Sequence, residues 1–394
     1  MPDRIYFDHS ATTPMDSRVA NAMLPCLGAL YGNPSSLYEA GRKAHSAVEE
    51  ARRQVADLFH ARADEIIFTS SGTEANNLAL TGFVEAREQK NIHLVTSAIE
   101  HPSILKTCRY LESRGVAVTY LPVSSEGIVE PKVLEAAIRS ETRLVSIMTA
   151  NNVIGTIQPI KELGKIAHRH GVVFHTDAVQ AFGKLQIDTR DQAADLISVS
   201  AHKLYGPKGI GALYVRKGIP INPILHGGGQ ERGLRSATEN VPGIMGFGRA
   251  AQIAQEEMPH DAAKLVEWRE TMLDYVLNKI PGAYLIGHPY ARLPGHLCLG
   301  FSGLEGDTIK LMMLLDEAGV AVSTGSACSA HQKAEASYIL QALGFDPLKA
   351  RGALRVTLGR FNSKEEVERF LEILPKAVSK LQPMSTRLVA NTQN

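Results

Sequence analysis

A stretch of small and hydroxyl-bearing residues follows an apolar segment and leads into a helix that we expect from Leu78 onward. It reads Phe68-Thr-Ser-Ser-Gly-Thr-Glu-Ala-Asn-Asn77. Backbone N–H groups at such a helix start, helped by the Thr73 hydroxyl, could hold a phosphate monoester. The same turn is also typical of a plain helix N-cap, so the motif alone does not distinguish a phosphate-binding site from a structural cap. It is not a Walker loop, because GxxxxGK[ST] is absent.

Two further residues with chemical potential stand at the ends of apolar, β-rich runs. Asp177 follows Val172–Thr176, and Lys203 lies in Ser200-Ala-His-Lys203-Leu-Tyr-Gly-Pro-Lys-Gly209. A carboxylate at the edge of a buried sheet could keep a pyridinium nitrogen protonated. A lysine removed from water could form a Schiff base with a carbonyl cofactor. The alternatives are an Asp177 that caps the next helix and a Lys203 that is simply solvated.

The four cysteines form neither CxxC pairs nor a Cys/His cluster, which argues against a zinc site and against a disulfide scaffold. Cys328 lies among small residues, in Ser323-Thr-Gly-Ser-Ala-Cys-Ser-Ala-His-Gln-Lys333, and we expect an exposed loop there. An exposed loop suits a nucleophile that must travel. Cys26, Cys108 and Cys298 are expected in a helix end, a helix and a buried strand, where thiols are inert.

The elements that must position these residues follow an alternating pattern. Ala44, Val48, Ala51 and Val55 recur at helical spacing, and seven short β-rich runs then alternate mostly with helix-like segments. The pattern predicts an α/β fold, with a mainly parallel seven-stranded sheet in a large domain over residues 16–258. Residues 1–15 and 259–394 are expected to form a smaller α+β domain that carries the Cys328 loop. The seven runs are 65–69, 93–97, 116–122, 144–149, 172–176, 196–200 and 211–215.

Charge and hydropathy restrict the partners. Lys+Arg 42 against Asp+Glu 41 gives a formal net charge of +1, so no whole-chain field would hold nucleic acid or anionic lipid. The longest apolar runs are too short to span a bilayer, and the N-terminus shows no apolar stretch of signal length. We therefore expect a cytoplasmic protein with no direct nucleic-acid or membrane partner.

Five motifs in one order together closely resemble the NifS/IscS-type (class I) cysteine desulfurases. They are EHPSIL, HTDAVQ, SAHKLYGPKG, HGGGQERGLRSATEN and GSAC, and the similarity covers essentially the whole chain. That family consists of fold-type I enzymes of the class-V aminotransferase group that depend on pyridoxal 5'-phosphate (PLP). The resemblance therefore implies PLP as the cofactor and the fold-type I transferase architecture.

The resemblance also implies roles for residues at matching positions. Lys203 would form the Schiff base with PLP, Asp177 would pair with the pyridine nitrogen, and Gln180 would bond the ring oxygen. His101 would stack on the ring and could move protons. The other cofactor contacts would come from Gly72, Thr73, Asn152, Ser200 and His202, with Thr238 reaching the phosphate from the partner subunit of a homodimer. The departures from the family pattern are Ser71-Gly72, where many relatives have Gly-Ala, and Ala237, where glycine is common.

The implied reaction takes sulfur from L-cysteine, leaves L-alanine and stores the sulfur as a persulfide on Cys328. Arg355 resembles the arginine that grips the substrate carboxylate, with Asn33 as a helper. An iron–sulfur scaffold or another sulfur-acceptor protein would receive the sulfur, with iron–sulfur cluster assembly favoured. Cys328 could also ligate a cluster transiently, although no permanent metal site is expected. A selenocysteine lyase, another fold-type I PLP enzyme and a non-catalytic scaffold stay open as alternatives, and His331 and Lys333 have no assigned role.

Overall fold

A seven-stranded sheet forms the centre of the larger part of the molecule. The computed structural model describes residues 4–88, 91–189, 191, 193–324 and 336–381. The strand order is β2-β8-β7-β6-β5-β3-β4, in which only β8 runs antiparallel to its neighbours. The mainly parallel sheet expected from the sequence is therefore confirmed. The strands are β2 (Ile66–Thr69), β3 (His93–Ser97), β4 (Ala117–Leu121), β5 (Thr142–Ser146), β6 (Val173–Asp177), β7 (Leu196–Ser200) and β8 (Gly211–Val215).

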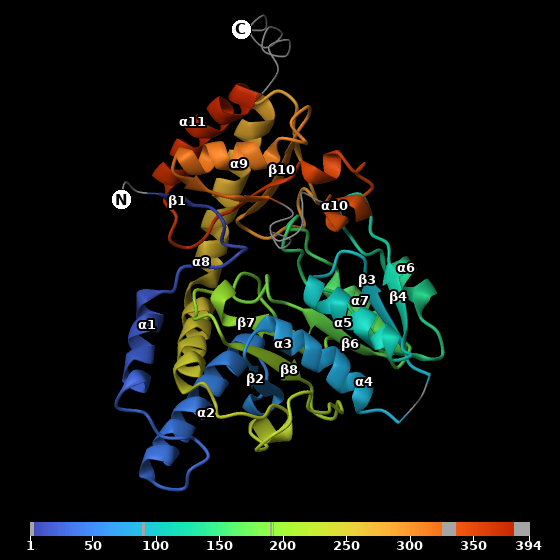
Figure 1. Ribbon diagram of the computed structural model, residues 1–394, viewed down its shortest axis with the longest axis vertical. Coiled ribbons are helices and arrows are strands. Elements are labelled where there is room, and N and C mark those ends of the chain that lie inside the picture. Colours follow the sequence, from blue (N-terminus) through green and yellow to red (C-terminus); the bar gives the residue numbers. More distant parts are fainter. Residues whose placement is uncertain (1–3, 89–90, 190, 192, 325–335, 382–394) are drawn as a thin grey trace, which may run out of the picture.

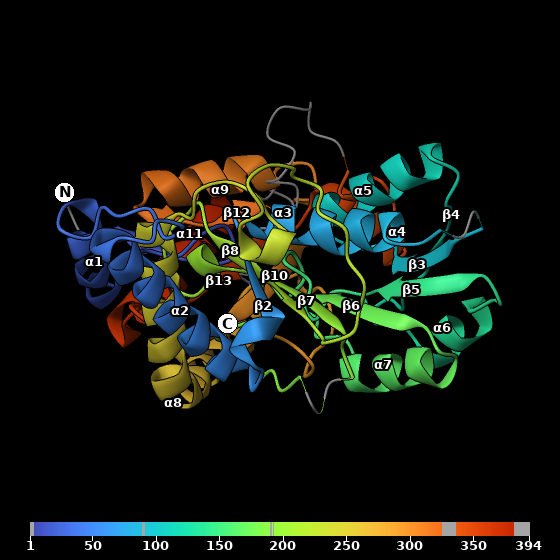
Figure 2. The same ribbon diagram turned by 90° about the horizontal axis from the view of Figure 1, so that it is seen from below.

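Helices cover both faces of this sheet, because its strands are apolar on both sides (Figure 2). In β2, Ile66 and Phe68 pack into one core cluster, while Ile67 between them packs into another on the opposite face. One face carries α2 (Glu39–Phe59), α6 (Pro131–Ala137), α7 (Ile160–Arg169) and the first part of α8 (Val241–Lys279). The other carries α3 (Gly72–Asn77), α4 (Phe83–Glu85) and α5 (Pro102–Ser113).

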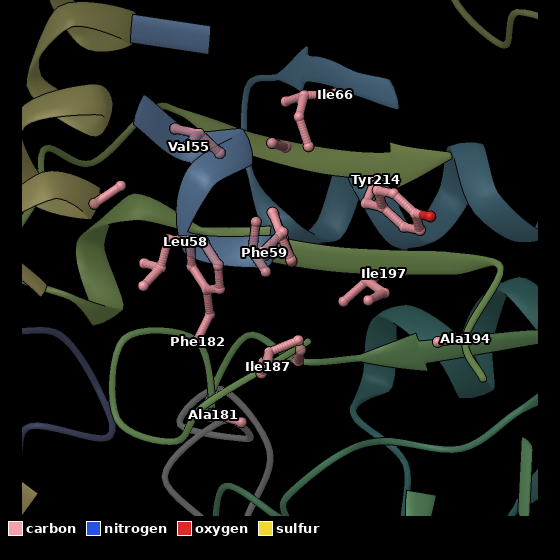
Figure 3. Packing of buried hydrophobic residues seen from close by; sticks show 14 of the residues in the cluster. Val55, Leu58, Phe59, Ile66, Ala181, Phe182, Ile187, Ala194, Ile197 and Tyr214 are labelled. Carbon is pink, nitrogen blue, oxygen red and sulfur yellow. The ribbon is translucent and has the colours of Figure 1, made fainter. Parts of the chain in front are cut away.

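Aromatic packing closes the sheet against α2. The rings of Phe59 and Phe182 stack with their centroids 4.3 Å apart, and Tyr214 of β8 approaches Phe59 at 6.0 Å. Figure 3 shows Val55, Ile66 and other apolar side chains around these rings. This layer fixes the strands on which the polar loops at the sheet edge depend.

A second, antiparallel sheet lies in the smaller part, in the order β12-β13-β10-β9. Its strands are β9 (Ala283–Leu285), β10 (His296–Phe301), β12 (Ser323–Thr324) and β13 (Leu354–Thr357), with α9 (Thr308–Glu317), α10 (Tyr338–Ala342) and α11 (Lys364–Leu381) nearby. A capping box opens α11, since the N–H of Ser363 donates to the Glu366 carboxylate and the N–H of Glu366 donates to the Ser363 hydroxyl. Near the N-terminus, β1 (Ile5–Tyr6) pairs in parallel with β11 (Val320–Ala321).

Helix α8 belongs to both parts (Figure 1). Its first half packs into the core of the large sheet, and its second half packs into the apolar cluster of the smaller sheet. The predicted domain division after residue 258 therefore falls inside one continuous helix, next to Pro259. Residues Ile5 and Phe7 pack in the smaller cluster. The remaining helix of the N-terminal region, α1 (Ser17–Met23), lies against α8.

Candidate active site

The loops that leave the carboxyl ends of β2, β3, β5, β6 and β7 line one cavity of about 310 Å³. These five strands point the same way, so the loops after them meet at one edge of the sheet, where α/β folds bind ligands. Strand β13 of the smaller sheet adds Arg355. Of the residues predicted from the sequence, the cavity is lined by Gly72, Thr73, His101, Asn152, Asp177, Gln180, Ser200, His202, Lys203 and Arg355.

Asp177, the last residue of β6, is buried and held by two donors. Asn76 Nδ2 donates to its Oδ2 at 2.7 Å, and the backbone N–H of Val179 donates to its Oδ1 at 2.9 Å. Both carboxylate oxygens are therefore fixed within the cavity wall. The sequence analysis did not identify Asn76. A signal was available, because an asparagine on the sheet-facing side of a helix is buried and therefore needs a polar partner.

Lys203 follows β7 on a short 3₁₀ turn, Ala201–Lys203. Its Nζ donates to the carbonyl oxygen of Ala11 at 2.7 Å and also to that of Ser10. Gln180 Nε2 donates to the same Ser10 oxygen at 2.9 Å. The N-terminal segment thus supplies part of this wall, and no sequence motif indicated it.

The residues predicted to hold a phosphate also belong to this cavity. Gly72 lies so close to its surroundings that an added Cβ would stand 2.6 Å from Val179 Cγ2 and 3.4 Å from Ser200 Cβ. His202 faces Thr12 Oγ1 at 3.1 Å. Burial, with smaller contributions from Lys203, Lys208 and Lys184, lowers the pKa of His202 to about 4. His202 is therefore neutral at neutral pH, so it donates a hydrogen bond from one ring nitrogen and accepts one at the other.

His101 caps helix α5. Its Nδ1 lies 3.2 Å from the backbone nitrogen of Ser103 and 2.8 Å from the Ser103 hydroxyl. Burial lowers the pKa of His101; Asp177 opposes this change and Lys203 adds to it. The imidazole is thus neutral under ordinary conditions.

Arg355 reaches the cavity with part of its hydrogen-bonding capacity unused. Its Nη1 donates to the Asn152 carbonyl at 2.9 Å, and its Nη2 donates to Asp8 Oδ1 at 2.7 Å. Arg355 Nε and Asn152 Oδ1 are buried without a partner among the described residues. The unused Arg355 donor fits an anionic group of a ligand, and the unused Asn152 oxygen fits a ligand donor, so the cavity suits a polar ligand that carries both.

Two predicted residues among those that the structure describes do not enter this arrangement. Asn33 is exposed and its side chain accepts from the backbone N–H of Ser35 at 2.9 Å, so it shapes its own turn. Thr238 is exposed and does not line the cavity. Its neighbour Ala237 has a φ of 118°, a conformation that favours glycine. Cys328, with His331 and Lys333, lies outside the described residues.

The other three cysteines are buried, as the sequence predicts. Burial raises the pKa of Cys108 and of Cys298 to about 12 in each case, and it raises that of Cys26 as well. A thiol with a raised pKa carries little thiolate and is a poor nucleophile at neutral pH. None of these three therefore suits a sulfur carrier.

The cavity fits PLP through the types of its side chains. A carboxylate at Asp177, an amine at Lys203, an imidazole at His101 and a close backbone approach at Gly72 are the groups that this cofactor requires. The sheet and these groups together define a fold-type I, PLP-dependent transferase. Residues 5–370 match the aminotransferase class-V family model.

Curated relatives narrow that class. The chain is 48% identical over 381 residues to a protein of Methanosarcina thermophila called cysteine desulfurase IscS, with 97% of this chain and 93% of that protein covered. It is 44% identical to a human protein called cysteine desulfurase, with 97% of this chain and 83% of that protein covered. The chain belongs to the IscS/NifS-type cysteine desulfurases of the aminotransferase class-V family, which are PLP-dependent enzymes.

Solved structures agree with that assignment. A structure called NIFS-like protein superposes with a TM-score of 0.89 at 40% identity, covering 96% of this chain and all of that one. Another, called SspA in complex with cysteine, gives 0.80 at 36% identity over 91% of this chain and all of that one. Among the described residues, no helix is both long and apolar enough to cross a membrane.

Proposed function

We propose that this protein converts L-cysteine to L-alanine and keeps the sulfur as a persulfide on Cys328. In this reaction the substrate Cβ–S bond breaks, a new S–S bond forms at Cys328, and one proton replaces the sulfur on Cβ. No external oxidant or reductant is needed, because the persulfide and the alanine together balance the cysteine and the thiol. The later release of the sulfur to an acceptor restores the thiol.

Nine residues of the cavity would hold the cofactor. Lys203 would carry it covalently, and Asp177 would pair with its ring nitrogen. His101 would stack on the ring and Gln180 would bond the ring oxygen. Gly72, Thr73, Ser200 and His202 would hold the phosphate, with Asn152 as a further contact. When bound, PLP withdraws electrons from the α-carbon of an attached amino acid.

The chain's own groups would then do the following. The Lys203 amine would take the proton from the substrate α-carbon and return it, since an amine in this cavity is a general base. Arg355 would bind the α-carboxylate through the donor that is unused in this structure. The Cys328 thiolate would attack the substrate sulfur. Asn33 stays a proposed helper of Arg355.

One observation carries this proposal: Asp177 and Lys203 line the same cavity, together with Arg355. These side chains come from two separate strand ends and from the second sheet. A non-catalytic scaffold does not require them to line the same cavity, whereas a PLP enzyme does. The names of the relatives, cysteine desulfurase IscS and SspA in complex with cysteine, support the choice of cysteine as the substrate.

Mass spectrometry of the purified protein after cysteine addition tests the proposal. We expect one added sulfur atom on the peptide that contains Cys328, and the loss of this signal in Lys203→Ala. If Cys328→Ser still released sulfide from cysteine at the full rate, the persulfide route would be wrong. A selenocysteine lyase or another fold-type I enzyme that does not need this thiol would then be favoured.

We propose a homodimer in which Thr238 of each chain contacts the partner's cofactor phosphate; the exposure of Thr238 supports this placement. An iron–sulfur scaffold is the proposed sulfur acceptor, because two of the relatives named above are of the IscS and NifS types. Other sulfur-acceptor proteins remain the second choice. The cytoplasm is the proposed location, since thiols stay reduced there.

A further inference from the structure

Asp177 and His101, the two residues predicted to contact the cofactor ring, are joined by a chain of hydrogen bonds through Asn76 and Ser103. Asn76 Nδ2 lies 2.7 Å from Asp177 Oδ2 and 2.8 Å from Ser103 Oγ. Ser103 Oγ lies 2.8 Å from His101 Nδ1. His101 Nδ1 also has a second contact, since the backbone N–H of Ser103 donates to it at 3.2 Å. Asn76, Ser103 and His101 therefore link α3 and α5 to the end of β6.

The direction of each hydrogen bond in this chain follows from its chemistry. A carboxylate only accepts, so the Asn76 amide nitrogen must face Asp177 and donate to it. The same nitrogen faces Ser103 Oγ, which accepts its second hydrogen. The Ser103 hydroxyl hydrogen then points to His101 Nδ1, the next polar atom within hydrogen-bond distance. In this orientation Asn76 Oδ1 faces away from both partners, and it is buried without a partner among the described residues.

The protonation state of His101 follows independently from the helix cap. A backbone N–H can only donate, so Nδ1 of His101 accepts the hydrogen of Ser103 N. A hydrogen on Nδ1 would oppose that N–H, and the N-terminus of α5 also disfavours a positive charge there. The charged groups near His101 are Asp177, which favours the imidazolium, and Lys203, which opposes it. Arg355 lines the same cavity and Lys106 a neighbouring one, and both also disfavour it.

We propose that Asn76 and Ser103 are positioning residues that hold His101 as the neutral tautomer with its hydrogen on Nε2. In this state neither ring nitrogen has a lone pair available for a proton from the substrate. His101 then acts as a hydrogen-bond donor and as a wall for the ring, and proton transfer falls to Lys203. The role of His101 at the cofactor rests on the proposed function, whereas its tautomer does not.

Long-range ¹H–¹⁵N NMR of the full chain with labelled histidine tests the tautomer directly, and His101→Gln assigns the signal. The spectrum is recorded without cofactor and again with PLP bound. We expect a protonated Nε2 and an unprotonated Nδ1 throughout the neutral pH range. A hydrogen on Nδ1, or an imidazolium at neutral pH, would overturn the proposal. Sulfide release from cysteine is measured on the same samples, so a failure of the proposed activity is seen separately.

Ser103→Ala tests the direction of the hydroxyl bond. Because the hydroxyl donates to Nδ1, its removal should raise the proton affinity of His101 about fivefold, equivalent to a neutral hydrogen bond of about 1 kcal/mol. If the hydroxyl instead accepted a hydrogen from an imidazolium, the affinity would fall, and a fall or no change refutes the assignment. Thr107→Val is the matched control, because this hydroxyl lies on the same helix and bonds Ser103 O and Asn77.

Asn76→Ala tests whether the amide acts through the serine. The variant should raise the proton affinity of His101 less than Ser103→Ala does, since the hydroxyl is still present but no longer oriented. In the double variant the effect should equal that of Ser103→Ala alone. Additive effects of the two substitutions would show that Asn76 acts on His101 by another path, and would remove it from this chain.

Discussion

Substitution of Gly72, at the start of α3, tests how closely the backbone must approach the residues that follow β6 and end β7. A methyl group at Gly72 would stand 2.6 Å from Val179 Cγ2, well inside van der Waals contact. The valine cannot easily turn away, because its side chain is β-branched and its backbone N–H holds Asp177. Overpacking of this kind costs about 1–3 kcal/mol.

Although many relatives have alanine at this position, Gly72→Ala should lower the free energy of unfolding of this PLP-loaded protein by about 1–3 kcal/mol, because the methyl group would meet Val179. Urea denaturation followed by circular dichroism measures this loss, and absorbance titration of the cofactor-free protein shows how much of it is lost PLP affinity. Val179→Ala in the same chain removes the contacted methyl group, so the double variant should regain most of the loss.

Gly306→Ala is the matched control, because a methyl group at this exposed position would come no closer than 3.9 Å to another atom, Leu348 Cδ1. Its φ also lies outside the left-handed region. A Gly72→Ala variant that is as stable and binds PLP as well as Gly306→Ala would contradict the expected clash. Failure of Val179→Ala to restore the double variant would contradict it too.

Three further changes give distinct outcomes. Cys328→Ser should abolish persulfide formation and sulfide release, whereas Cys298→Ala should keep both, as mass spectrometry and a sulfide assay would report. Asp8→Ala should lower the free energy of unfolding by about 3 kcal/mol in urea, because it leaves the buried Arg355 guanidinium without its counter-ion; a loss below about 1 kcal/mol would contradict this. Burial raises the pKa of Glu100 from 4.5 to about 8, so the folded chain keeps a proton that the unfolded chain releases between these values. Stability therefore falls as the pH rises through that window, and Glu100→Gln should remove this part of the fall in urea titrations at several pH values.

Much of the fold could be predicted because its strands are buried on both faces. His93–Ser97, Leu196–Ser200 and Gly211–Val215 occur as expected. The run expected over 144–149 is instead the strand Thr142–Ser146, because residues 147–150 continue the apolar run into the core and the cavity wall. Strands β1 and β9 are too short for a periodic pattern and depend on pairing with β11 and β10.

The position of a site residue could be predicted from the sequence where the residue ends a strand. It could not be predicted where the residue is held by partners that are distant in the chain. Asp177 and Lys203 follow apolar runs, and both line the cavity. The Arg355 side chain could not be oriented from the pattern, because every residue of β13 is buried. Its contact with Asp8, and that of Asn76 with Asp177, join positions far apart in the chain and arise only from tertiary packing.

The carbonyl groups of Ser10 and Ala11 have a consequence for biosynthesis. This early segment is held by Thr357, whose N–H donates to Phe7 and whose hydroxyl accepts from Ser10. A nascent chain gains this support for the wall around Lys203 only after residue 357 has left the ribosome. Chains truncated before that residue should therefore bind PLP more weakly and emerge less coloured.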